Sequence, residues 1–282
     1  MLIDFHTHTF PNKMAAKVID NLSQKSRSKA FTNGTVDELL NSMNKAEIDL
    51  SIVLPVATKP EQVPKVNDAS KILNDRYESK IISFACIHPD YENYISELKR
   101  IKNLGFKGIK IHPVYQGVDL DDVRYLKIFD QAAQLDLIVI THSGLDIGFP
   151  GVKHSSPLMA RNVIEKIGNF KFVLAHMGAW RQWKEVTEIL ADKKIFVDTA
   201  FSTGLIKPRQ GCKWNDEELK MLNADQFIKM IKTFGVEQIL FGTDSPWSDQ
   251  LESKKFIEDL NLSTEDKNKI LGENAERLLL NH

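Results

Sequence analysis

The segment LIVITHSG, residues 137–144, places five apolar or β-branched residues directly before a histidine and a glycine. A nearly unbroken apolar run of this length is typical of a parallel strand that is buried on both faces. The segments KFVLAHMG (171–178) and QILFGTDSPW (238–247) repeat the arrangement. The ionisable residues that end these three runs are His142, His176 and Asp244. The pattern predicts a parallel sheet with polar side chains at the carboxyl ends of its strands.

Strands of this kind recur along the whole chain, and each is followed by a segment with helical periodicity. An open doubly wound sheet and a closed (β/α)8 barrel both fit this alternation. The strand-linked G-x-G-x-x-G of a dinucleotide-binding sheet is missing, and eight strands match the barrel. We therefore predict the α/β class, with one TIM-barrel domain over residues 1–282 and extra C-terminal helices at 264–271 and 273–280. The predicted strands are 2–5, 51–54, 81–85, 108–111, 137–141, 171–175, 195–198 and 238–242.

Three connections that follow strands are long, at residues 11–33, 143–156 and 200–223. In a barrel such connections lie on the carboxyl-end face, where active sites are built. The stretch 12–30 carries five Lys or Arg residues and one Asp, and we interpret it as a solvated flap.

Composition excludes several classes of function. The 282 residues are 42% hydrophobic, and 37 Lys and Arg nearly balance 38 Asp and Glu, so no global charge favours nucleic acid or an anionic membrane. Two cysteines, Cys86 and Cys212, are too few for a disulfide framework and are typical of a reducing compartment. No leader pattern and no apolar stretch of about 20 residues is present. We expect a soluble cytoplasmic protein that acts on a small-molecule substrate. The composition is compatible with a homo-oligomer.

Histidines gather where the strands end. His6 and His8 stand two apart at the end of the first strand, so alternation predicts both side chains on one face. His142, His176 and Asp244 each follow an apolar run and are expected at the same rim of the barrel. One such histidine is ordinary, but four with a carboxylate form the ligand set of a zinc-type centre. The sequence therefore predicts a metal site.

The motifs DFHTH, GFKGIKIHP, ITHSG, LAHMGAW, FGTDSPW and ILGENAERLL resemble the amidohydrolase superfamily. They are most similar to its amidohydrolase-2 branch, which includes 2-amino-3-carboxymuconate semialdehyde decarboxylase and pyrone-dicarboxylate lactonase. The resemblance covers nearly the whole chain and implies a (β/α)8 barrel with a divalent metal. It implies His6, His8, His142 and Asp244 as metal ligands, and His176 as a catalytic histidine that does not bind the metal.

These assignments leave a coordination position for water, with one Zn²⁺ per chain expected and Mn²⁺ or Co²⁺ as substitutes. Asp244 is then placed to take a proton from the activated water and deliver it to the leaving group. His176 would stabilise the developing oxyanion or orient the water. We expect a hydrolase of a small ester, lactone or amide.

Other functions stay open to different degrees. The alternative is a non-oxidative decarboxylase of a small unsaturated or aromatic acid, although few arginines are available to hold a carboxylate. Deaminase chemistry is disfavoured, because the acid expected three residues after His142 is Leu145. A non-catalytic binding module is disfavoured because none of the five site residues is missing.

Four further residues are candidates for substrate contact. Lys110 and His112 alternate onto one face of the fourth strand, and Trp180 and Arg181 follow His176. Lys110 could instead be carboxylated and bridge a second metal, or pair with a core carboxylate such as Asp4. Trp180 and Arg181 could equally pack at the start of a helix.

Overall fold

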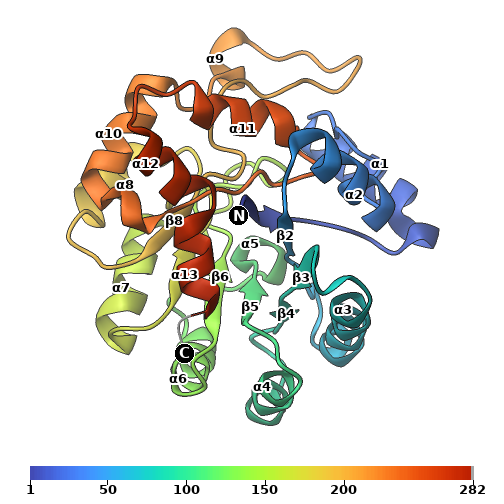
Figure 1. Ribbon diagram of the computed structural model, residues 1–282. Helices are drawn as coiled ribbons and strands as arrows, with labels where there is room; N and C mark the ends of the chain where they lie inside the picture. Colours follow the sequence, from blue (N-terminus) through green and yellow to red (C-terminus); the bar gives the residue numbers. More distant parts are fainter. Residues whose placement is uncertain (281–282) are drawn as a thin grey trace.

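Short parallel strands form the centre of the molecule in the computed structural model, which describes residues 1–280 (Figure 1). They make two hydrogen-bonded groups, ordered β1-β2-β3 and β4-β5-β6-β7-β8-β9. The strands are β1 Ile3–Thr7, β2 Leu50–Val53, β3 Ile81–Ser83, β4 Ala85–Cys86, β5 Gly108–Ile111, β6 Ile138–Thr141, β7 Phe172–Leu174, β8 Phe196–Asp198 and β9 Ile239–Leu240. Each predicted strand lies over one of these elements.

The two groups join at both of their edges. A single residue, Phe84, separates β3 from β4, and its N–H donates to the Val53 carbonyl over 2.9 Å. At the other edge, the Phe5 N–H donates to the Phe241 carbonyl over 2.7 Å. The pair β3 and β4 is therefore one barrel strand that changes partners at Phe84. Eight strands close on themselves, which confirms the predicted TIM barrel.

Helices surround the strands (Figure 1). The helix Val36–Ala46 begins at a capping residue, because the Thr35 hydroxyl accepts the Glu38 N–H. The α-helices are α1 Asn12–Ser26, α2 Val36–Ala46, α3 Val63–Tyr77, α4 Tyr94–Asn103, α5 Pro113–Gln116, α6 Val123–Gln134, α7 Pro157–Ile167, α8 Trp183–Ile189, α9 Asp216–Leu219, α10 Ala224–Phe234, α11 Gln250–Glu258, α12 Thr264–Asn268 and α13 Asn274–Leu280. Two 3₁₀ turns span Pro60–Gln62 and Val236–Gln238.

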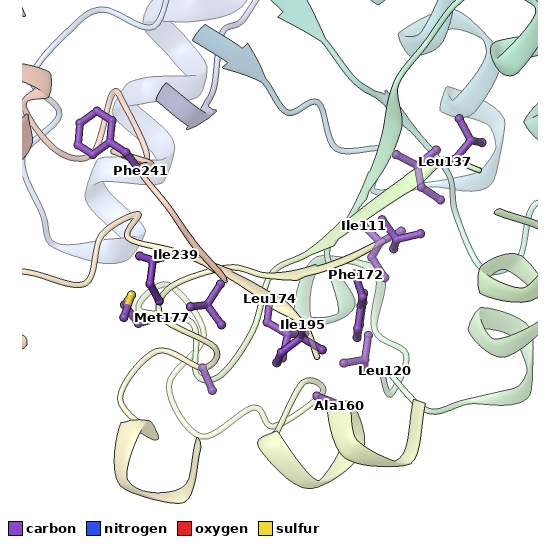
Figure 2. Close-up of a cluster of buried hydrophobic side chains, with 14 of the residues drawn as sticks. Ile111, Leu120, Leu137, Ala160, Phe172, Leu174, Met177, Ile195, Ile239 and Phe241 are labelled. Carbon is purple, nitrogen blue, oxygen red and sulfur yellow. The ribbon is translucent and has the colours of Figure 1, made fainter. Parts of the chain in front are cut away.

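The apolar core has two layers. Between strands and helices, Phe172 and Leu174 pack with Ala160 of α7 and other buried side chains (Figure 2). Inside the barrel, Phe5 and the inward side chains of neighbouring strands form a second cluster. Leu278 and Leu279 of α13 belong to this inner cluster. The predicted C-terminal helices therefore seal one end of the barrel and leave the carboxyl ends of the strands for the site.

Two expected loops are more ordered than predicted. The stretch 12–30, interpreted as a solvated flap, contains the 15-residue helix α1. The loop 200–223 contains α9 and is tied to the end of α1, because Lys29 N–H donates to the Lys207 carbonyl and Arg209 N–H to the Arg27 carbonyl. None of the described helices has both the length and the apolar character that crossing a membrane would require.

Candidate metal centre

A β-bulge in β1 sets the direction of the first histidines. The pairing of β1 with β2 shifts between Asp4 and Thr7, so that Phe5 and His6 lie opposite Ile52 alone. Phe5 packs into the inner cluster, and His6 lines the cavity at the carboxyl ends of the strands. A bulge of this type re-aims one side chain without ending the strand. Strict alternation therefore fails between Phe5 and His6, whereas His6 and His8 share one face as predicted.

The same bulge separates Asp4 from the site. Its carboxylate accepts hydrogen bonds from the Thr243 hydroxyl at 2.6 Å and the Gln250 amide at 2.7 Å. The carboxylates whose charges act on Lys110 are instead Asp198 and Asp244. The suggested pairing of Lys110 with Asp4 is therefore wrong, because the Asp4 carboxylate is held by other donors.

His6, His8 and Asp244 form a tight cluster. The two Nε2 atoms of the histidines lie 3.2 Å apart. The Oδ1 atom of Asp244 lies 3.0 Å from Nε2 of His8 and 3.5 Å from Nε2 of His6. Three potential ligand atoms thus face one point, in a donor set of two imidazoles and a carboxylate.

The opposite ring nitrogens show which tautomer each histidine adopts. Nδ1 of His6 lies 2.8 Å from the Asp198 carboxylate, and Nδ1 of His8 lies 2.8 Å from the Leu54 carbonyl. A backbone carbonyl and an ionised carboxylate can only accept, so both Nδ1 atoms carry the proton when Asp198 is ionised. Nε2 of each ring is then unprotonated, and its lone pair is directed at the other ring and at Asp244. Metal-binding histidines are oriented by this kind of second hydrogen bond.

His142 and His176 repeat the pattern. Nδ1 of His176 lies 2.8 Å from the Ala200 carbonyl, and Nε2 of His142 lies 3.2 Å from the Leu145 carbonyl. The remaining nitrogens, Nε2 of His176 and Nδ1 of His142, lie 3.0 Å apart. Two lone pairs therefore face each other, which is unfavourable unless a proton or a metal cation lies between or beside them. Burial opposes the proton, because it lowers the pKa of His176 to about 4 and that of His142 well below its usual value.

These residues fit a divalent cation. The Nε2 atoms of His6 and His8 converge with the Asp244 carboxylate, and His142 and His176 bring two more lone pairs to the same cavity. The buried ammonium of Lys110 lies 3.5 Å from Nε2 of His6. Burial lowers the pKa of Lys110 to about 8 and raises that of Asp198 to about 7. One cation bound by His6, His8 and Asp244 would relieve the repulsion among these three acceptors. Nitrogen and carboxylate oxygen donors in this number are those that zinc-type metals use.

The backbone is strained at two site residues. His176 has a φ angle of 62° and Asp244 one of 63°. Both lie in the left-handed region, which residues other than glycine seldom occupy. Such conformations persist where the surrounding structure imposes them, and they cluster at functional sites. His176 and Asp244 are the two residues to which the sequence assigned catalytic roles.

The four predicted substrate contacts divide three to one. Lys110, His112 and Trp180 line a cavity of about 790 Å³ that also includes the metal cluster. Arg181 is not among the lining residues: its guanidinium stacks on the Trp180 ring and donates to the Glu218 carbonyl. We therefore do not retain Arg181 as a substrate contact.

The sequence analysis did not identify two acidic residues of the site. Asp198 ends β8 and holds both the His6 ring and the backbone N–H of His176, at 2.8 and 2.9 Å. The rule that selected the other strand ends, an ionisable residue after an apolar run, would have found it.

Asp146 is the second missed residue, and no pattern marks it in its loop. It lines the cavity with its carboxylate 3.6 Å from Nε2 of His112 and 3.8 Å from Nε2 of His142. These three side chains are close enough to hold a metal ion. However, Nδ1 of His112 accepts the Tyr115 N–H, so Nε2 of His112 carries a proton and is a donor rather than a ligand.

Comparisons with known proteins agree on the architecture. The sequence model of a family described as amidohydrolase matches residues 3–280. A search of curated proteins gave no match. Among solved structures, an uncharacterised TIM-barrel protein from Bordetella bronchiseptica is similar, with a TM-score of 0.76, 16% identity and coverage of 99% of this chain and 98% of that one.

Two decarboxylases are also similar in structure. Dihydroxybenzoic acid decarboxylase from Polaromonas, solved with manganese and 2-nitroresorcinol, has a TM-score of 0.70 and 16% identity over 99% of this chain and 96% of its own. For 5-carboxyvanillate decarboxylase from Sphingomonas paucimobilis, the TM-score is 0.69 and the identity 14%, over 99% and 98%. At these identities the likeness shows a shared fold.

Proposed function

Because the chain belongs to the amidohydrolase family, we propose that it is a metal-dependent hydrolase of a small ester, lactone or amide. The observation that carries the proposal is the convergence of the unprotonated Nε2 atoms of His6 and His8 with the Asp244 carboxylate, in a cavity that His142 also lines. Three imidazoles and one carboxylate leave a position for water or substrate in a five-coordinate site.

A bound divalent cation supplies Lewis-acid activation of water and of a carbonyl oxygen. We propose zinc, with one ion per chain held by His6, His8, His142 and Asp244. Manganese or cobalt could replace it, since the same donors accept several divalent metals. A second ion is expected only if Lys110 is carboxylated.

The side chains of the protein divide the proton transfers. Asp244 Oδ1 accepts a proton from the attacking water and returns it to the leaving oxygen or nitrogen. His176 is held by its hydrogen bond to the Ala200 carbonyl, so its Nε2 faces the cavity as an acceptor that orients the water. The ammonium of Lys110, which is buried beside His6, stabilises negative charge that develops on the substrate oxygen.

The cavity wall supports hydrolysis over decarboxylation. Among its described lining residues the cationic side chains are Lys25, Lys65 and Lys110, and none is an arginine. A carboxylate that must be oriented for loss of carbon dioxide is best held by the planar, bidentate guanidinium. Hydrolysis needs no such group.

Decarboxylation of a small unsaturated or aromatic acid is the second candidate. Lys110 favours it, because a buried ammonium beside the metal cluster could bind one substrate carboxylate as a point charge. The decarboxylases of similar fold agree with this alternative.

A substrate panel separates the two reactions. Lactones, esters and amides form one half, and hydroxybenzoates and carboxymuconate-like acids form the other. We expect metal-dependent hydrolytic turnover that Asp244→Asn abolishes. Metal-dependent release of carbon dioxide without any hydrolytic turnover would overturn the proposal in favour of the lyase.

A further inference from the structure

The cavity extends well beyond the metal cluster. Its volume of about 790 Å³ lies in the range that encloses drug-sized ligands, whereas a small acid or lactone would fill only part of it. From His6 and His8 the lining continues past Val56 and reaches the outer helices α2 and α3 at Val36 and Val66. The site thus has a metal end and a long arm that leads away from it.

One wall of this arm is α1. Met14, Val18 and Leu22 of this helix line the cavity at a spacing of four residues, which places them on one helical face. None of the three is buried, and Met14 is 56% exposed. An apolar stripe on a helix ordinarily packs against another element, and here it faces the cavity.

The other wall is α3, which lies on the same side of the barrel as α1 and α2 (Figure 1). Val66, Ala69 and Leu73 of α3 line the cavity at spacings of three and four residues. A second apolar stripe therefore borders the same space as the first. Elsewhere in the ring, neighbouring helices such as α6 and α7 pack directly on each other.

We propose that this arm binds an apolar chain of the substrate, so that the enzyme acts on an ester, lactone or amide that carries an extended alkyl or aryl group. The inference rests on the proposed function, because the scissile carbonyl must lie at the metal end. Two observations favour a substrate chain as the occupant over a protein partner. The arm is continuous with the metal cluster, and its lining includes apolar side chains from two helices, α1 and α3.

Binding of straight-chain carboxylates, from acetate to decanoate, tests the arm without any catalysis. Isothermal titration calorimetry of the metal-loaded enzyme should show Kd falling roughly threefold to fourfold per added methylene until the arm is full. A Kd that does not depend on chain length would overturn the proposal.

A matched pair of variants locates the chain. Ala69→Trp places an indole in the arm from an exposed position, where folding tolerates it. Ile72→Trp is the control, because Ile72 lies on the same helix, is 69% exposed and does not line the cavity. We expect Ala69→Trp to weaken octanoate at least tenfold while butyrate binds as before, and Ile72→Trp to change neither.

The opposite wall gives an independent pair, Val18→Trp and its neighbour Lys17→Trp, which does not line the cavity. The same selective loss of octanoate is expected for Val18→Trp alone. Equal losses of affinity for butyrate and octanoate would overturn the proposal. A molecular mass that differs between Val18→Trp and the wild type, measured by sedimentation equilibrium, would also overturn it, because the arm would then be an interface between copies. Chain-length-dependent binding without turnover on any ester, lactone or amide would support the arm and contradict the proposed hydrolase instead.

Discussion

The Asp198 carboxylate accepts the Nδ1 proton of His6 over 2.8 Å, and this bond joins residues that are 192 positions apart in the chain. Its consequence is electronic as well as structural. With Nδ1 protonated, His6 must present the lone pair of Nε2 to the cluster of His8 and Asp244. The other oxygen of Asp198 accepts the backbone N–H groups of His176 and Ala200, so one carboxylate orients two sides of the site.

Replacing Asp198 by asparagine should therefore weaken metal binding. An amide that donates to Nδ1 of His6 reverses the tautomer and directs an N–H into the cluster. We expect metal affinity to fall by about 10- to 100-fold with the fold retained, as for other groups that orient metal ligands. Competition with a chromophoric chelator measures the change, and circular dichroism checks the fold. Asp192→Asn, an exposed aspartate, is the control, and equal affinities for the two variants would contradict the role of Asp198.

Much of the fold was predictable because buried parallel strands are apolar throughout. β5 occupies the predicted residues 108–111, and each of the other predicted strands overlaps an observed one. The bulge in β1 was not predictable, since it depends on the register of Asp4 and Thr7 against β2. The helix α1 was missed because its charged residues suggested a solvated segment, although Val18 and Leu22 follow helical spacing.

The candidate site was predictable where chemistry and strand ends coincide. His6, His8 and Asp244 come together as expected, because the carboxyl ends of barrel strands share one rim. The partners of the histidines were not predictable in the same way. The carbonyls of Leu54 and Ala200 accept their protons, and a backbone carbonyl has no signature in the sequence.

The second prediction concerns pH and His88, which lies away from the metal cluster. Burial lowers the pKa of His88 below its usual value of 6.5, so the unfolded chain binds more protons at this residue than the folded one. The contribution of neutral His88 to the free energy of unfolding is therefore present above pH 6.5, and it is lost as the pH falls toward the lower pKa of His88 in the folded protein. Urea unfolding of the metal-free protein should show the wild type losing more stability than His88→Gln between about pH 7.5 and pH 5. Parallel profiles for the two proteins would count against this prediction.

The third prediction is that the two thiols differ in reactivity. Cys86 is fully buried, and burial raises the pKa of its thiol to about 12, so at pH 8 roughly one molecule in ten thousand carries the thiolate. Cys212 is partly exposed. We expect one thiol per folded chain to react with an aromatic disulfide reagent and a second only after unfolding. Cys212→Ser should remove the fast phase, and a fast phase that persists in this variant would assign it to Cys86.

The last prediction separates the roles of His142 and His176, whose unprotonated nitrogens lie 3.0 Å apart. Either could complete the cluster of His6, His8 and Asp244, because each ring donates its other N–H to a carbonyl. The resemblance of the motifs to the amidohydrolase family assigns the ligand role to His142 and catalysis to His176. We expect wild-type protein to hold about one divalent ion per chain and His142→Ala to lose it.

His176→Ala should keep both the metal and the fold, and lose about 10²- to 10⁴-fold in kcat, the scale for a positioned acid–base or oxyanion group. Elemental analysis of each purified variant, together with turnover on the best substrate of the panel, gives both readouts. Loss of metal from His176→Ala as complete as that from His142→Ala would make His176 a ligand. Asp244 would then still carry the proton transfers, and the orientation of the attacking water would fall to a group other than His176.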